Sequence, residues 1–246
     1  MKRTLQVLAV LFLAPLYAGR SQDAPTRQTP DLATLSPPVR ALVEKLRGTE
    51  LAGQLEGAAG LGLMGERAAP AIPFLIRVLE RYDGMVEVDS ALMKYFEPGT
   101  SFLVYQGKAN TINPAQLVAA ANLARIGRPA IQPLSVALQG ADPTELYFAH
   151  LADALARIPD PAATAILMNH LKGTDRHARS RAAAALRWNI DPASLDGLIA
   201  ALDDADEDVR GEAVRSLERR SGQTFGPDAA KWRAWRAGQS GTPPGL

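Results

Sequence analysis

The octapeptide "IQPLSVAL" at residues 131–138 carries the pattern that decides the fold. Its residues Ile131, Leu134 and Leu138 follow the i, i+3, i+7 spacing of one face of an amphipathic helix. Four other stretches repeat this spacing, with a threonine at the first position in one of them: "VRALVEKL" (39–46), "IPFLIRVL" (72–79), "TAILMNHL" (164–171) and "LDGLIAAL" (195–202). The repetition predicts one structural unit used five times.

A second apolar stripe follows each of these helices. Its best-defined positions are five leucines: Leu61, Leu123, Leu155, Leu186 and Leu217. Small residues stand four and three positions before most of them, which lets neighbouring helices approach closely. We call the first helix of each pair the A helix and the second the B helix. A hairpin of about 30 residues cannot bury its apolar face alone. The pattern therefore predicts an all-α fold, a right-handed α-solenoid of about five stacked helical hairpins.

Helix boundaries are marked independently of the leucines. Glycines two residues after the last leucine of three A helices predict left-handed helix ends: Gly48, Gly140 and Gly173. Side-chain caps followed by proline predict four helix starts: Asn113, Asp142, Asp160 and Asp191.

These repeats resemble the HEAT-repeat family in its short bacterial form. The resemblance is carried by "LMGERAAPAIPFLIRVL" (63–79), "LARIGRPAIQPLSVAL" (123–138) and "LDDADEDVRGEAVRSL" (202–217), and it extends over about residues 37–237. The ending "SGQTFGPDAAKWRAWR" (221–236) is similar to the terminal segment of such proteins. Trp232 and Trp235 lie on one helical face there and predict a cap over the end of the stack. In some members of the family, the turns between A and B helices grip a partner.

The N-terminal residues have the features of a secretory signal peptide. Lys2 and Arg3 precede an apolar stretch at residues 5–18, which is shorter than the roughly 20 residues of a bilayer-spanning helix. A buried N-terminal helix is the alternative. We expect residues 1–18 to be the signal, 19–36 a flexible linker, 37–238 the solenoid and 239–246 a disordered tail. The protein would then be exported, periplasmic or secreted, with no membrane insertion after signal removal.

Composition limits the classes of function. The 27 basic and 26 acidic residues of the 246-residue chain nearly cancel, so no nucleic-acid partner is expected. The chain has no cysteine, which excludes disulfides, thiolate metal sites and a cysteine nucleophile.

The second repeat contains an insertion. Its A-helix and B-helix leucines are 44 residues apart, against 15 in repeats one, four and five, so about 29 residues are added, which we place at 84–112. Residues 86–96 could form a short helix, and strand composition at 101–106 with a turn at Gly107 and Lys108 is compatible with a β-hairpin. Five side chains here either pack on the array or contact a partner: Tyr95, Phe96, Phe102, Tyr105 and Lys108.

A ladder of side chains stands two residues after the B-helix leucines. Its members are Arg125, Arg157, Trp188 and Arg219, with Arg187 directly before the tryptophan. Basic residues in the last turn of a helix stabilise its dipole, which explains them structurally. If they align along the solenoid, they also form a basic stripe that could meet an acidic partner.

Other motifs do not indicate catalysis. Gly60, Gly62 and Gly65 match G-x-G-x-x-G but lie within a B helix and follow no strand, so they predict no dinucleotide site. The same glycine-rich helix predicts a less stable first repeat. The three histidines lack the spacing of a zinc site.

We therefore expect no catalytic residues, no cofactor and no metal. The sequence indicates an exported, non-enzymatic helical-repeat scaffold that binds a protein partner. The alternatives are a lyase-type chaperone or enzyme built on HEAT-like repeats, and a purely structural envelope module.

Overall fold

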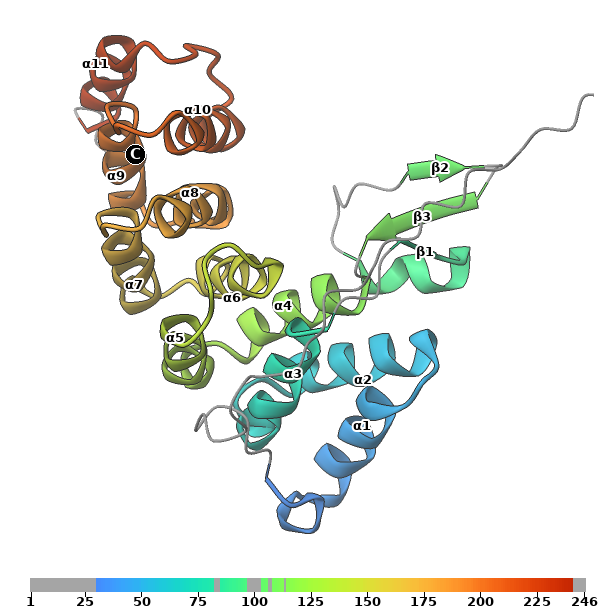
Figure 1. Ribbon diagram of the computed structural model, residues 1–246. Helices are drawn as coiled ribbons and strands as arrows, with labels where there is room; N and C mark the ends of the chain where they lie inside the picture. The colour runs from blue at the N-terminus through green and yellow to red at the C-terminus, as the bar shows by residue number, and fades with distance from the viewer. Residues whose placement is uncertain (1–29, 82–84, 97–102, 106–107, 113, 241–246) are drawn as a thin grey trace, which may run out of the picture.

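The computed structural model describes residues 30–81, 85–96, 103–105, 108–112 and 114–240. Within these residues, five helical hairpins stack into two layers along a curved array (Figure 1). The A layer consists of α1 (Pro37–Arg47), α3 (Ile72–Leu79), α5 (Ile131–Gln139), α7 (Pro161–Leu171) and α9 (Ala193–Ala201). The B layer consists of α2 (Leu51–Met64), α4 (Pro114–Ile126), α6 (Leu146–Ala156), α8 (Arg176–Ala185) and α10 (Glu207–Ser221). The B layer lies on the inner side of the bend. The predicted α-solenoid is confirmed.

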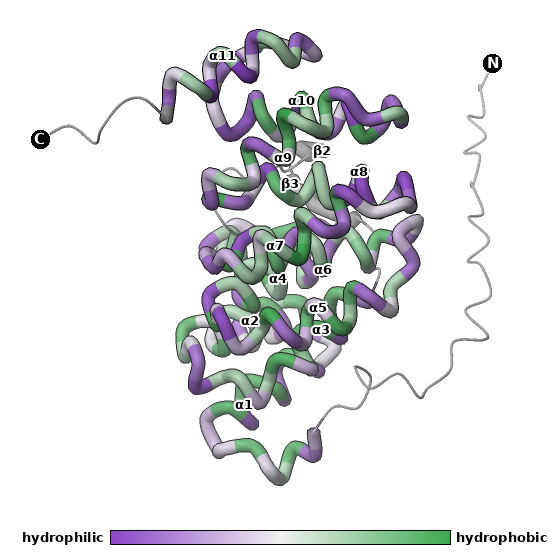
Figure 2. Tube along the Cα trace, turned by 90° about the vertical axis from the view of Figure 1, so that its left-hand side faces the viewer, coloured by the Kyte–Doolittle hydropathy of each residue, from purple (hydrophilic) through white to green (hydrophobic). Residues whose placement is uncertain are grey.

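The core runs continuously between the two layers. All five B-helix leucines are fully buried, at 0% exposure: Leu61, Leu123, Leu155, Leu186 and Leu217. Burying a leucine side chain contributes about 1.5–3 kcal/mol. Figure 2, viewed from the A-layer side, shows the hairpins stacked one above another from α1 to α11 (Ala229–Ser240). Each hairpin therefore depends on its neighbours to cover its apolar face.

Short 3-10 segments extend several helices. η3 (Gly65–Ala71) leads into α3, η5 (Arg128–Ala130) leads into α5, and η6 (Leu186–Trp188) continues α8. Gly65 (φ 56°), Gly127 (φ 81°) and Gly222 (φ 71°) end three B helices with positive φ, a conformation that favours glycine.

The prediction that A-helix glycines take this conformation is wrong. Gly48 has φ −63° and Gly140 has φ −90°, and Gly173 is not among the positive-φ glycines. A Cβ at Gly48 or Gly173 would lie 3.2 Å from a helix carbonyl oxygen, so there the absence of a side chain gives room.

One predicted helix start is also wrong. Asp160 caps α7 as expected, because its carboxylate accepts a hydrogen bond from the Ala162 amide at 2.8 Å. Asp142 instead accepts from the amide and hydroxyl of Thr144 in a turn, and α6 begins only at Leu146. Asp191 accepts from the Ala193 amide at the start of α9. Asn113 lies outside the described residues.

Both ends of the array extend further than the sequence suggests. At the N-terminal end, Leu35 is buried after η2 (Leu32–Thr34), and the Arg40 guanidinium donates to the carbonyls of Leu32, Ala33 and Leu35. The predicted linker therefore ends before this segment, not at residue 36. At the other end, α11 continues to Ser240, so residues 239 and 240 are helical and not part of a tail.

The terminal helix α11 covers the open end of the stack as predicted. Trp232 is fully buried and contacts the rings of Phe225 and Trp235 edge-on. Its indole N–H donates to the Gly226 carbonyl at 2.8 Å. Arg236 pairs with Asp196 of α9 at 2.8 Å.

The insertion forms a three-stranded antiparallel sheet with strand order β1-β3-β2. Its elements are β1 (Met85–Glu87), η4 (Ser90–Tyr95), β2 (Leu103–Tyr105) and β3 (Lys108–Ile112). The predicted β-hairpin is present, but Lys108 pairs with Tyr105 inside the ladder and is not part of the turn. The predicted helix at 86–96 is replaced by a strand that pairs with β3, followed by the short helix η4.

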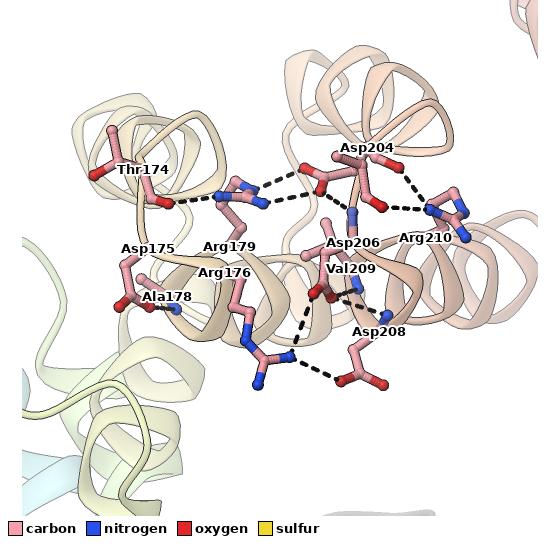
Figure 3. A network of polar contacts seen from close by, with 11 residues as sticks. Thr174, Asp175, Arg176, Ala178, Arg179, Asp204, Asp206, Asp208, Val209 and Arg210 are labelled. Atoms are coloured by element: carbon pink, nitrogen blue, oxygen red, sulfur yellow. Dashed lines mark hydrogen bonds and ion pairs between the residues drawn. The ribbon is translucent and has the colours of Figure 1, made fainter.

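An ion-pair network joins repeats four and five at the turns between their A and B helices (Figure 3). The Arg179 guanidinium donates to both carboxylate oxygens of Asp204, at 2.8 and 3.0 Å, and to the carbonyls of Gly173 and Thr174. Arg210 makes the equivalent backbone bonds to Asp204 and Ala205 one repeat later. Burial acts to raise the pKa of Asp204, but the bonds from Arg179 and the Asp206 amide outweigh it and lower that pKa.

The glycines of α2 are close-contact positions. A Cβ at Gly57 would lie 2.6 Å from the Leu42 carbonyl oxygen and 2.7 Å from the Leu46 amide nitrogen of α1. A Cβ at Gly62 would overlap the side chain of Asn122 on α4. Gly53 has only an ordinary contact, 3.6 Å from the Lys45 oxygen. The lower stability of the first repeat stays a prediction, but these glycines are what allows α2 to pack between its neighbours.

We predict opposite effects for alanine at two positions of α2. Gly57→Ala should lower the free energy of unfolding by about 1–3 kcal/mol, because the new methyl group overlaps the α1 backbone. Gly53→Ala should raise it by about 0.5–1 kcal/mol, because only the helix propensity changes. Urea unfolding followed by circular dichroism measures both. Equal stability of the two variants would contradict the close contact.

We predict a favourable coupling between Arg179 and Asp204. A double-mutant cycle with Arg179→Ala and Asp204→Ala should give about 1 kcal/mol, because the pair is bidentate and its side chains are only 16% and 13% exposed. Arg210→Ala is the matched control: Arg210 makes the same backbone bonds, and within the described residues it forms no ion pair. Arg210→Ala should lower the free energy of unfolding by less than Arg179→Ala does. An equal loss would show that the backbone hydrogen bonds, and not the ion pair, account for the contribution of Arg179.

Candidate functional site

The ladder residues lie on the face of the B helices that points away from the core. Two residues after a buried leucine correspond to a rotation of about 200° around an α-helix. The positions concerned are Leu63, Arg125, Arg157, Trp188 and Arg219. Arg125 and Arg219 are exposed, and Arg157 and Trp188 are half-buried. We call this surface the B face.

Trp188 is the centre of the ladder. The guanidinium carbon of Arg157, from the preceding repeat, lies 4.0 Å from the centre of the Trp188 ring system. The guanidinium carbon of Arg219, from the following repeat, lies 4.3 Å away, and that of Arg187 lies 5.4 Å away. Contacts of this kind contribute about 0.5–2 kcal/mol each. The structure thus brings four of the five predicted ladder residues together across three repeats.

Arg125 forms a separate rung one repeat earlier. Its guanidinium donates to the side-chain oxygen of Asn122 at 3.2 Å. Asn122 is buried and donates to the Val118 carbonyl at 2.8 Å, so Arg125 is anchored on its own helix α4.

One carboxylate lies within the tryptophan cluster. The Arg187 guanidinium approaches the Asp153 carboxylate at 3.4 Å. Burial raises the pKa of Asp153 above its ordinary value, and the charges of Arg187, Arg157 and His150 only partly oppose this effect. His150 contacts the Leu79 carbonyl through Nδ1 at 3.1 Å, which ties this part of α6 to the A layer.

Arginines outnumber carboxylates on the B face of repeats two to five. The outward-facing positions of a B helix are those two residues after, two residues before and five residues before its buried leucine. The carboxylates and arginines at these positions are Asp153, Glu212, Arg125, Arg157, Arg181, Arg215 and Arg219. Both carboxylates have arginine partners: Asp153 pairs with Arg187, and Glu212 pairs with Arg215 at 2.7 Å. Of these five B-face arginines, Arg125, Arg181 and Arg219 form no ion pair with the residues that the structure describes.

Exposed apolar side chains accompany these arginines. Leu63 is 80% exposed at the ladder position of repeat one, and Leu146 is 45% exposed on the same face of α6. Ile190 is 74% exposed and follows Trp188 by two residues. The sequence pattern does not single out any of these three side chains as exposed, although Leu63 occupies the ladder register of repeat one.

The predicted residues of the insertion fall into two groups. Tyr95 and Phe96 are half-buried and pack against the hydrophobic core, together with Leu92. Tyr105 and Lys108 are Cα partners at the β2–β3 end of the sheet, and their side chains lie outside the described residues. Phe102 also lies outside them. Of these five residues, Tyr95 and Phe96 are the two whose side-chain surroundings are described, and both pack against the side of the array.

The comparison with protein families agrees with the helical arrangement. Residues 131–218, which run from α5 through α9 and include most of α10, match the family model for HEAT repeats. These residues are HEAT repeats. The match confirms the resemblance over these residues, which include three of the five ladder residues, Arg157, Arg187 and Trp188. Arg219 directly follows the matched stretch. A search of curated proteins found no match.

Two further observations concern chemistry and membranes. No group of three or more histidine, aspartate or glutamate side chains is placed to hold a metal ion in the described residues. His170 packs edge-on against Phe148, and burial lowers the pKa of this histidine. None of the described helices has the length and apolar character that crossing a membrane requires.

We predict that Asp153→Asn becomes more stable relative to the wild type as the pH rises. The raised pKa means that the folded state holds the Asp153 proton more tightly than the unfolded chain does. The associated stability is present below about pH 4, the ordinary range for aspartate, and is lost as the pH rises above it. Unfolding measurements at pH 4 and pH 7 on both proteins test this.

Asp204→Asn is the control of opposite sign. The pKa of Asp204 is lowered, so its contribution is present above about pH 4 and is lost as the pH falls. This variant should be less stable than the wild type at pH 7, with a difference that shrinks in acid. The same pH dependence for both variants would contradict the assigned environments.

Proposed function

We propose that this protein is an exported, non-enzymatic scaffold that binds a protein partner through the B face of its HEAT array. The observation that carries the proposal is the alignment of Arg157, Trp188 and Arg219 from three successive repeats in one stack. HEAT repeats generally mediate protein interactions, and extended concave surfaces are how solenoids bind.

The composition of this surface fits protein recognition. Arginine and tryptophan are enriched where binding energy concentrates in protein interfaces. The stacked guanidiniums are held in place before any partner arrives, so less side-chain freedom is lost on binding. Ile190 follows Trp188 by two residues and Leu63 holds the ladder position of repeat one, so both add exposed apolar area to the ladder.

Export is supported by the sequence alone. The basic residues Lys2 and Arg3 and the apolar stretch at 5–18 have the order of a secretory signal. The array would then act outside the cytoplasm.

The sheet of the insertion is a second candidate surface. It projects from the N-terminal side of α4 on the same side of the array as the B layer (Figure 1). Among the described residues, β1 and β2 are the edge strands and each pairs with the central strand β3. Because Tyr95 and Phe96 pack against the core, a contribution of the insertion to binding would come from the sheet.

Affinity capture from an envelope extract tests the proposed surface. Wild-type protein is compared with the double variant Arg125→Glu and Arg219→Glu, whose side chains are exposed. We expect at least one captured protein to be lost from the variant while its circular dichroism is unchanged. An unchanged set of captured proteins would overturn the B face as the binding site and favour a purely structural module.

Arg77→Glu is the matched control. Arg77 is also an exposed arginine in the last turn of a helix, α3, but it belongs to the A layer. The substitution therefore has the same unfavourable effect on a helix dipole without changing the B face, and the captured proteins should stay. A parallel deletion of residues 84–112 tests the insertion separately.

A further inference from the structure

Three arginines surround Trp188, but they differ in how far a partner protein can reach them. Arg219 is exposed, whereas Arg157, Arg187 and Trp188 itself are half-buried. The guanidinium carbon of Arg219 lies 4.3 Å from the centre of the Trp188 ring system. Arg219 is therefore the member of this cluster that a partner meets first.

The Trp188 ring is what holds Arg219 in position. Among the described residues, the Arg219 side chain makes no hydrogen bond and no ion pair beside this ring contact. Its neighbour Arg220, by contrast, donates to the Ser194 hydroxyl at 2.6 Å and to the Asp191 carbonyl at 3.2 Å. A long side chain without polar anchors keeps its rotamer freedom unless a surface holds it. The place of the Arg219 charge thus depends on the place of the ring.

The Trp188 ring is in turn tied to Asp153 of the preceding repeat. The indole N–H of Trp188 is buried and makes no hydrogen bond of ordinary geometry with the described residues. Its acceptor is the Asp153 carboxylate, because this N–H acts to lower the pKa of that group. The Arg187 guanidinium, next to Trp188 in the chain, approaches the same carboxylate at 3.4 Å. From α6, Asp153 thus contacts both residues of the Arg187–Trp188 pair.

The Asp153 carboxylate also offsets the positive charges around the ring. Its side chain is only 22% exposed, so water screens its interactions weakly. Arg187 on η6 and, on its own helix α6, Arg157 and His150 all act on it electrostatically. Without this carboxylate, the guanidiniums around Trp188 would repel one another, and the edge of the ring would lose its acceptor.

We propose that Asp153 is a positioning residue of the B face. From repeat three, its carboxylate fixes the Trp188 ring of repeat four, and this ring holds the Arg219 guanidinium of repeat five where a partner protein binds it. This inference rests on the proposed function. It adds a residue that acts on the partner through other side chains.

Nitrogen-15 NMR of the full chain tests the positioning step. The indole signal of Trp188 is assigned with Trp188→Phe, and the Nε–H signal of Arg219 with Arg219→Lys. Asp153→Ala should shift the Trp188 signal and make the Arg219 Nε–H group more mobile in relaxation measurements, while the indole signals of Trp232 and Trp235 stay. Asp153→Asn should change both less, because its amide oxygen still accepts from the indole N–H. Unchanged Trp188 and Arg219 signals in Asp153→Ala would overturn the proposal.

The pH dependence of the same indole signal separates an effect of the carboxylate from a loss of packing. In the wild type, the Trp188 signal should shift as Asp153 titrates, and in Asp153→Asn this transition should be absent. A transition that both proteins share belongs to another group, such as His150. Asp153→Asn keeps the volume of the side chain, so this comparison decides even if Asp153→Ala does not fold. Identical titration of the Trp188 signal in both proteins counts against the proposal.

Affinity capture tests the functional step. The readout is the captured protein that is lost from the double variant Arg125→Glu and Arg219→Glu. Asp153→Ala should reduce the recovered amount of this protein about threefold or more, because the partner must then order Arg219 itself. Asp204→Ala is the matched control: it removes a carboxylate that pairs with Arg179 of repeat four at 2.8 Å, and capture should stay unchanged.

The two proposals can fail separately. If charge reversal loses a captured protein but Asp153→Ala retains it in full, Asp153 is not a positioning residue and the scaffold function stands. If charge reversal leaves the captured set unchanged, the B face is not the binding site, and the role of Asp153 falls with it. Loss in both variants, with capture by Asp204→Ala unchanged, supports both proposals.

Discussion

Every B helix of this protein is packed against neighbouring helices, and this constraint determines most of the rest. A helix in that position needs one large buried residue and small residues around it. The fully buried leucines, from Leu61 to Leu217, meet the first need. The glycines of α2 meet the second in an extreme form, because Gly57 and Gly62 leave no room for a methyl group. Stability is therefore shared between repeats, and the two ends require covers, which η2 and α11 supply.

The same leucines orient the surface that we propose to be functional. The position two residues later lies on the opposite side of the helix, so the buried leucine of each repeat sets the register of one side chain that is exposed or half-buried. Because the repeats stack in order, the side chains at this position form a row along the B layer. Trp188 replaces an arginine in this row, and the replacement turns separate charges into a stacked cluster.

The sequence predicts the hairpins because leucine spacing is a local property of each helix. It predicts the ladder register for the same reason, including Arg157, Trp188 and Arg219. It does not predict the contacts made by α2, since Leu42 and Asn122 approach Gly60 and Gly62 only after the helices pack. It also misses strand β1, because Met85–Glu87 becomes a strand only by pairing with β3, some 25 residues later. The leucine spacing predicts positive-φ glycines after the A helices, whereas in the structure they follow the B helices at Gly65, Gly127 and Gly222.

The Trp188 stack has a mechanical consequence. Its ring is held by groups from the repeats before and after it, so the two ring–guanidinium distances depend on how far α6 and α10 are splayed around α8. Opening the array would lengthen both distances, and closing it would shorten them. The local curvature of the array and the geometry of the Trp188 stack therefore change together. Trp188 is a chromophore at the point where this change occurs.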